Sequence, residues 1–358
     1  MKRVLLAGLF LVLAYPLMQA QMLCVGNHWT EAQGRNHLDS VLRVVTDRVQ
    51  WERRAERIRQ QLLTGMSLTD LDAPREKPTI RAGRVHEMDG YRVTNLEIEA
   101  EPGSWITGNL YEPVGMKGPF AGILCPHGHW SDPADYGRFR HDMQKRCIVF
   151  CRMGAVVFAY DMVGYGPNRQ APSHEDPLAL RIQTRNSVRI VDYLLSRKDV
   201  DPKRIAVTGA SGGGTQSFIL TAVDPRVSLS IPAVQVSAHF FGGCVCESGM
   251  PIHKAPGFQT NNVEIAALAA PRPMLVISDG ADWTRNTPVV EYPFLSRIYS
   301  FYGKPDRVDN AHFAGEKHDY GFSKRQAAYR FLAKHFHLKA DPALWSEEGL
   351  TMLAKEEL

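Results

Sequence analysis

The sequence predicts an α/β fold in which helices cover both faces of a mostly parallel central sheet. From Pro119 onward, short continuous apolar runs such as FAGILC and AVVFAY alternate with longer segments of helical character. Strands that are buried on both faces have this appearance, and successive parallel strands need a crossover helix between them. The 358 residues, 44% of them hydrophobic and 22% charged, are enough to bury a large core without cross-links.

The first 20 residues are expected to be a signal peptide and not part of the fold. Lys2 and Arg3 precede an apolar run, and Ala20 is the small residue near which we expect cleavage. The run is too short to span a membrane, so we expect a secreted or periplasmic protein without stable membrane insertion. The formal net charge of +4 is too small to indicate nucleic-acid binding. The sequence makes no prediction of the oligomeric state.

Residues 21–80 are predicted to form an N-terminal helical extension and a linker. Thr30 and Gln33 have the spacing of a capping box, which predicts that a helix begins there. A second helical run, DRVQWERRAERIRQQLL, is expected to end near Gly65. The prolines at 74 and 78 then indicate a connecting loop.

Residues 81–340 are predicted to form the catalytic domain, and residues 341–358 a C-terminal tail. The turn at Asp89-Gly90 predicts a β-hairpin, and WITGNLYEP predicts a third short strand. The later strands are expected at 120–129, 155–166, 204–211, 228–238, 272–280 and 308–313, and the helices at 142–153, 178–197, directly after 211, 288–302 and after 322.

The stretch GASGG places Ser211 between a predicted strand and a predicted helix. A G-x-S-x-G turn in this context is typical of a nucleophile elbow, in which the serine takes a strained backbone conformation. The flanking glycines remove the Cβ atoms that would clash in so tight a turn. The alternative is a glycine-rich turn with a structural role only. The context favours Ser211 as a nucleophile.

A nucleophilic serine needs a base, and the base needs an acid that orients it. His318 follows the last predicted strand, where the base is expected. His312 is the rival, but it falls within that strand and is better explained as a core histidine. Asp282 is the favoured acid because it lies in a loop after a buried strand. Asp279, which ends that strand, and Glu247, which follows the preceding one, are the alternative acids.

The tetrahedral oxyanion of ester hydrolysis needs two hydrogen-bond donors. The backbone N–H of Gly212 is expected to be one, and that of His129, in the loop CPHGHW, the other. His127 and His129 could alternatively form a zinc pair, but no carboxylate ligand lies near them in the sequence. The predicted chemistry needs neither a cofactor nor a metal ion.

Six cysteines in an exported protein leave disulfides possible without fixing their pairing. Cys147 and Cys151 are four residues apart on one face of a predicted helix, where they could form a disulfide or remain two buried thiols. Cys244-x-Cys246 could also serve a metal or redox role. The remaining two are Cys24 and Cys125.

Four motifs together, DPKRIAVTGASGGG, CPHGH, YDMVGYG and EKHDYG, resemble secreted bacterial α/β-hydrolases of the carbohydrate esterase type. Acetyl xylan esterases and dienelactone hydrolase-like proteins are similar. The resemblance covers roughly residues 89–336. It implies an α/β-hydrolase fold with Ser211 as the nucleophile, His318 as the base and the His129 N–H as an oxyanion donor. Some relatives that act on uronic esters use a glutamate as the acid, which keeps Glu247 open.

The predicted function is a secreted serine esterase that removes ester groups, with acetyl placed first, from plant-type carbohydrate. The alternatives are a methyl esterase acting on uronic acid esters and a binding protein that keeps only the fold. Trp130, Tyr165 and Trp283 lie in loops after predicted strands and could bind sugar rings or simply wall the pocket. Three basic residues could meet a uronate carboxylate or be solvated loop charges: Arg169, His253 and Lys254.

Overall fold

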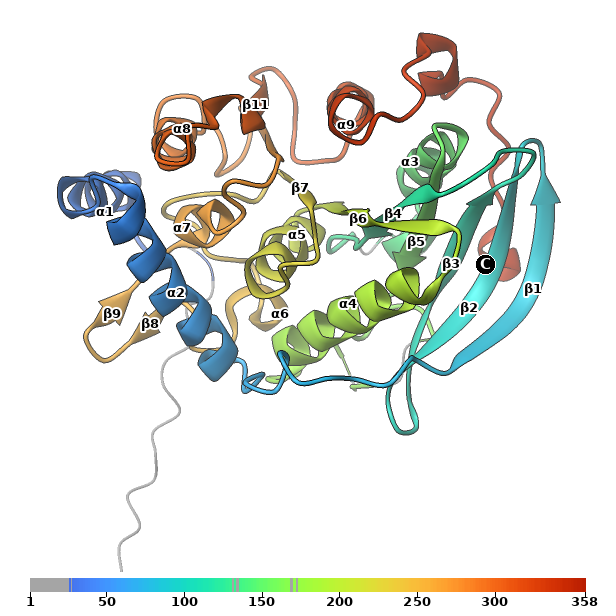
Figure 1. Cartoon of the computed structure of the whole chain (residues 1–358), viewed down its shortest axis with the longest axis horizontal. Coiled ribbons are helices and arrows are strands. Elements are labelled where there is room, and N and C mark those ends of the chain that lie inside the picture. Colours follow the sequence, from blue (N-terminus) through green and yellow to red (C-terminus); the bar gives the residue numbers. More distant parts are fainter. Residues whose placement is uncertain (1–25, 27, 131, 133–134, 168–169, 172) are drawn as a thin grey trace, which may run out of the picture.

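The computed structural model describes residues 26, 28–130, 132, 135–167, 170–171 and 173–358. The predicted signal peptide and Cys24 lie outside the described residues. Within these residues a nine-stranded sheet runs through the molecule (Figure 1), in the order β1-β2-β3-β5-β4-β6-β7-β10-β11. Its strands are β1 (Ile80–Met88), β2 (Tyr91–Glu101), β3 (Ser104–Pro113), β4 (Phe120–Cys125), β5 (Ala155–Tyr160), β6 (Val200–Ala210), β7 (Leu229–Ala233), β10 (Met274–Asp279) and β11 (Val308–Phe313).

The sheet has an antiparallel and a parallel part. β1, β2, β3 and β5 pair antiparallel, whereas β5, β4, β6, β7, β10 and β11 pair parallel in turn. The parallel strands β4, β5, β7 and β10 are buried along their full length, and β6 is buried from Ile205 onward, as their continuous apolar sequences predict. Because parallel strands end at the same edge, the loops after them gather at one edge of the sheet.

Helices cover both faces, which confirms the predicted fold class. The helices are α1 (Glu31–Val44), α2 (Arg48–Gly65), α3 (His141–Arg152), α4 (Ala179–Ser196), α5 (Gly212–Val223), α6 (Val245–Ser248), α7 (Asn262–Ala267), α8 (Glu291–Ser300) and α9 (Phe322–Phe336). The apolar residues of α4, α5, α7 and α8 form one core cluster, and those of α3 and α9 form a second cluster. These two clusters lie on opposite sides of the sheet (Figure 1).

The N-terminal helices pack onto the first of these clusters. The predicted capping box at α1 is present: Gln33 N–H donates to Thr30 Oγ1 and Thr30 N–H to Gln33 Oε1. Trp51 and Ile58 of α2 are fully buried in the core. α1 approaches the loop after β7 so closely that a Cβ on Gly34 would fall 2.9 Å from the backbone of Ala238. The extension is therefore docked against the loops that follow the parallel strands.

Other connections add detail that the sequence did not predict. The segment between β7 and β10 holds α6, α7 and a two-stranded hairpin, β8 (Lys254–Ala255) and β9 (Phe258–Gln259). Cys244 and Cys246 form a disulfide, whereas the thiols of Cys125, Cys147 and Cys151 are free and buried. Across the described part of the chain, none of the helices is sufficiently long and apolar to cross a membrane.

Candidate active site

Ser211 occupies a sharp turn between the end of β6 and the start of α5. Its φ of 56° and ψ of −124° lie in a backbone region that residues other than glycine rarely adopt. The neighbouring glycines are required by close packing. A Cβ on Gly209 would collide with the carbonyl oxygen of Pro126, and one on Gly213 would lie 2.5 Å from it. The turn thus has the geometry expected of a nucleophile elbow, with the N-terminus of α5 beside the serine.

His318 and Asp282 form a hydrogen-bonded pair at the same edge of the sheet. His318 follows β11 and Asp282 follows β10, and the His318 Nδ1–H donates to Asp282 Oδ2 at 2.5 Å. The Asp282 side chain is 3% exposed, and its other oxygen accepts hydrogen bonds from the backbone N–H and hydroxyl of Thr284, both at 2.6 Å. The aspartate is fixed on both sides, and the bond at Nδ1 leaves His318 Nε2 as the nitrogen available to a reacting proton.

Asp279 is engaged elsewhere. The Lys324 Nζ, which is fully buried in α9, donates to Asp279 Oδ2 at 2.9 Å. The backbone N–H of Ala281 donates to the other oxygen at 3.1 Å. This carboxylate therefore joins β10 to α9, and of the two aspartates it is Asp282 that contacts His318.

Glu247 lies in α6, and burial raises its pKa to about 7. Its carboxylate accepts a hydrogen bond from the backbone N–H of Gly243 and lies 3.6 Å from His129 Nδ1. A Cβ on Gly212 would fall 3.3 Å from Glu247 Oε1. Glu247 thus adjoins the residue after the serine, and its carboxylate also accepts a hydrogen bond from the Gln235 side-chain amide at 3.4 Å.

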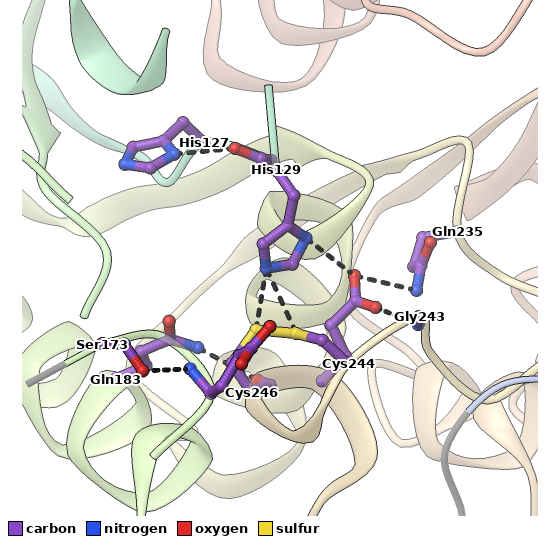
Figure 2. The surroundings of a disulfide bond; sticks show 11 residues. His127, His129, Ser173, Gln183, Gln235, Gly243, Cys244 and Cys246 are labelled. Carbon is purple, nitrogen blue, oxygen red and sulfur yellow. Dashed lines mark hydrogen bonds and ion pairs between the residues drawn. A yellow bond between two sulfur atoms is a disulfide. The ribbon is translucent and has the colours of Figure 1, made fainter. Parts of the chain in front are cut away.

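His129 lies in the loop after β4, with its ring against the turn. A Cβ on Gly212 would fall 2.6 Å from His129 Cε1, so the residues that carry the two predicted oxyanion donors are neighbours through the His129 ring. Burial lowers the pKa of His129 to about 4, and its ring is therefore neutral near pH 7. His129 Nε2 approaches the sulfurs of Cys244 and Cys246 (Figure 2).

His127 does not form a metal pair with His129. Its Nδ1 contacts the carbonyl oxygen of Gly128 at 2.9 Å, and its Nε2 accepts a hydrogen bond from the backbone N–H of Met162 at 3.0 Å. Both nitrogens are used, so this ring has no lone pair for a metal. His312 is placed opposite Ser278 across β10 and β11 and contacts its hydroxyl at 2.9 Å, as expected for a histidine within the sheet.

The predicted aromatic residues divide into two groups. Trp283 and Trp130 flank His318, with ring centroids 4.6 and 6.4 Å from its imidazole, and Trp283 also stacks on Phe240 at 3.9 Å. Tyr165 is buried and packs edge-on against His127 at 4.8 Å. The tryptophans are next to His318, the predicted base, whereas Tyr165 contacts His127 and His129.

A cleft of about 770 Å³ opens beside Asp282 and Trp283. The start of the N-terminal extension forms one side of it, and the loops after β7 and β10 form the other. Its lining residues are His28, Trp29, Thr30, Glu31, Gln33, His239, Phe240, Asp282, Trp283 and Arg285. The sequence did not predict that residues near position 30 reach this region, because no local pattern records how α1 docks.

Of the three basic residues that could meet a uronate carboxylate, the two that the structure describes do not line the cleft beside Asp282. Arg169 lies outside the described residues. His253 is buried, stacked on Phe241 at 4.4 Å and hydrogen-bonded to Asn262 at 2.7 Å. Lys254 is exposed on the β8–β9 hairpin. In the described region the cation that lines the cleft beside Asp282 is Arg285, which pairs with Glu31.

Comparison with known proteins gives matches to esterases, although no family model matches the chain. The solved structure of methylesterase BT1017 is 41% identical, with a TM-score of 0.84, over 90% of this chain and 72% of that chain. A 4-O-methyl-glucuronoyl methylesterase from Neurospora crassa is 28% identical over 188 residues, or 43% of this chain. The match spans 47%, about half, of that curated protein's length. A CE15 glucuronoyl esterase from Teredinibacter turnerae is 16% identical with a TM-score of 0.61, over 88% of this chain and 96% of that one, and shows the fold alone.

Proposed function

The chain belongs to the carbohydrate esterase family that includes methylesterase BT1017, and on that premise we propose that it hydrolyses a carboxylic ester carried by a carbohydrate. Ser211 is the nucleophile, His318 the general base and Asp282 the acid that orients it. The observation that carries the proposal is the His318–Asp282 hydrogen bond at the edge of the sheet where the strained Ser211 turn lies. A protein that only binds carbohydrate would need neither.

In this mechanism Ser211 Oγ attacks the ester carbonyl while His318 Nε2 takes its proton. The oxyanion is stabilised by the backbone N–H groups of Gly212 and His129. The alcohol then leaves with the proton from His318, and the acyl group stays on the serine. Water then attacks the acyl group on Ser211 while His318 takes its proton, and the carboxylic acid is released as Ser211 regains a proton from His318. The hydrogen bond from His318 Nδ1 to Asp282 holds the tautomer that this sequence requires.

We propose a methyl ester of a uronic acid as the substrate, in place of the acetyl ester that the sequence motifs favour. The support is the 41% identity to a methylesterase and the match to a glucuronoyl methylesterase. In such an ester the sugar is the acyl part and methanol is the leaving group. The sugar must therefore remain bound after the first step, and the cleft beside Asp282, with Trp29, Phe240 and Trp283, offers space for it.

We also propose that the protein is exported after cleavage near Ala20, because its first residues have the pattern of a signal peptide. Polymeric carbohydrate esters do not enter cells, so an exported esterase would meet this substrate. Mass spectrometry of the protein recovered from the culture fluid or periplasm tests this, and an uncleaved N-terminus in the cytoplasm would contradict it.

Release of methanol or acetate decides the substrate. Purified mature protein is incubated with methyl-esterified polygalacturonan, a methyl glucuronate and acetylated xylan, and both products are measured. We expect methanol from a uronate ester and no acetate above the level of Ser211→Ala. Acetate release that depends on Ser211, without methanol, would overturn the methyl ester and keep the esterase. If neither methanol nor acetate is released from any of these esters, the proposed function is overturned.

A further inference from the structure

Two imidazoles and two sulfurs converge beside the turn that holds Ser211. His129 Nε2 lies 2.7 Å from Cys246 Sγ and 3.4 Å from Cys244 Sγ (Figure 2). His174, in the segment after β5, stacks obliquely on His129, with ring centroids 5.3 Å apart. One donor atom each of His129, His174 and Cys244 lies within 4.8 Å of the other two. Three separate loops thus bring these groups to one place.

The donor set is the one that Zn²⁺ and similar soft divalent cations prefer. Tetrahedral zinc takes thiolate sulfur at about 2.3 Å and imidazole nitrogen at about 2.0 Å, which puts ligand atoms roughly 3.5 Å apart. The separations among these nitrogens and sulfurs are compatible with small side-chain shifts onto one ion. His129, His174 and Cys244 are each half-buried, so an ion can reach them from solvent.

Glu247 supplies the outer contact that a metal-binding histidine normally has. A ligating imidazole presents its second nitrogen to a carboxylate or carbonyl, which fixes the ring. While His129 Nε2 faces the sulfurs, its Nδ1 lies 3.6 Å from Glu247 Oε1. The carboxylate is itself held by the backbone N–H of Gly243. Glu247 is buried and has no role in the proposed ester mechanism. In the metal site it would orient the His129 ring.

We propose that His129, His174, Cys244 and Cys246 form a binding site for a soft divalent cation of the Zn²⁺ type, open when the Cys244–Cys246 disulfide is reduced. A dithiol reductant supplies two electrons and two protons, the S–S bond breaks, and the reductant becomes its own disulfide. The cation then binds both sulfurs and displaces their two protons to solvent. The site shares His129 with the proposed ester chemistry, which uses the backbone N–H of that residue and needs no metal, whereas the cation would bind the imidazole. The inference does not depend on the proposed function.

Cobalt is the probe, because thiolate-bound tetrahedral Co²⁺ gives a charge-transfer band and intense visible bands. The mature protein is reduced without oxygen by a phosphine, which takes an oxygen from water as the disulfide takes two protons. We expect a single equivalent of Co²⁺ to bind with these bands and to be displaced by Zn²⁺. The oxidised protein should not show them.

Variants separate this site from the buried thiols Cys125, Cys147 and Cys151. Cys244→Ser leaves Cys246 as the one thiolate of the site and should weaken the charge-transfer band by roughly half or more, and His174→Ala should weaken Co²⁺ binding at least about tenfold. His337→Asn, at an exposed helix end, is the matched control and should bind as the wild type does. Circular dichroism verifies that each variant is folded. The absence of these bands in the reduced wild type would overturn the proposal. Bands in Cys244→Ser and His174→Ala that are as intense as those of the wild type would also overturn it.

Discussion

Asp282 and Glu247 are both buried carboxyl groups, but they contact different histidines. Asp282 binds His318 Nδ1 directly, whereas Glu247 faces His129. Asp282→Asn keeps the shape of the pair but favours the wrong tautomer of His318, so we expect turnover to fall about 10⁴-fold. Glu247→Gln should cost far less. Both variants are assayed on one small ester, which removes most differences in sugar binding. A nearly normal Asp282→Asn rate with a large Glu247→Gln loss would reverse the assignment.

Glu247 should also leave a signature in the pH dependence of stability. Burial raises its pKa from 4.5 to about 7 in the folded protein. Protonated Glu247 therefore contributes stability that is fully present below pH 4.5 and is lost as the pH rises through 7. Glu247→Gln resembles the protonated form at every pH. We expect it to match the wild type in free energy of unfolding at pH 4.5 and to exceed it by up to about 3 kcal/mol at pH 8. A difference that does not change with pH, measured by urea unfolding, would contradict this.

At the scale of single elements, α9 is tied to β10 by the Lys324–Asp279 pair. Both side chains are fully buried, with Nζ and Oδ2 2.9 Å apart. Lys324→Met leaves a buried carboxylate without its main partner, so we expect it to lower the free energy of unfolding by about 3–5 kcal/mol. Adding Asp279→Asn should recover much of that loss. Chemical denaturation of the single and double variants measures it, and additive losses would mean that the pair is not coupled.

The N-terminal extension contributes to the proposed sugar cleft through Trp29, which directly precedes the cap of α1. Trp29→Ala removes one aromatic wall, at a cost of about 1 kcal/mol per ring contact. We expect KM for an oligosaccharide ester to rise about fivefold to tenfold, with turnover of a small chromogenic ester unchanged. Phe322→Ala, at an exposed aromatic residue of α9, is the control. Equal losses on both substrates would mean that Trp29 supports the fold and not the cleft.

The elements that the sequence predicted are those with local signals. The capping box at Thr30, the Asp89-Gly90 hairpin and the apolar parallel strands are each recorded within a few residues. The sequence does not predict the helices and strands between Gly242 and Ala267, because these helices are short and the hairpin has two-residue strands. Packing against neighbours, and not local pattern, determines such segments.

At the scale of the whole molecule, the candidate site exists because six parallel strands end at one edge. The loops after β6, β10 and β11 carry Ser211, Asp282 and His318, and their order along the chain predicted the site. Partners that depend on packing were not predictable: Lys324 reaching Asp279, the cysteine pair reaching His129, and the docking of α1 that brings Trp29 to the cleft. Each joins residues distant in sequence, without a motif that links them.

Trapping the acyl-enzyme tests most directly whether Ser211 is the nucleophile. The mature protein is mixed with excess methyl glucuronate, quenched in acid within the first turnovers, digested and mapped by mass spectrometry. We expect a uronoyl group on the peptide that contains Ser211, and none in Ser211→Ala, whose turnover should fall by several orders of magnitude. An acyl group on another residue, or activity of Ser211→Ala within about tenfold of the wild type, would contradict it.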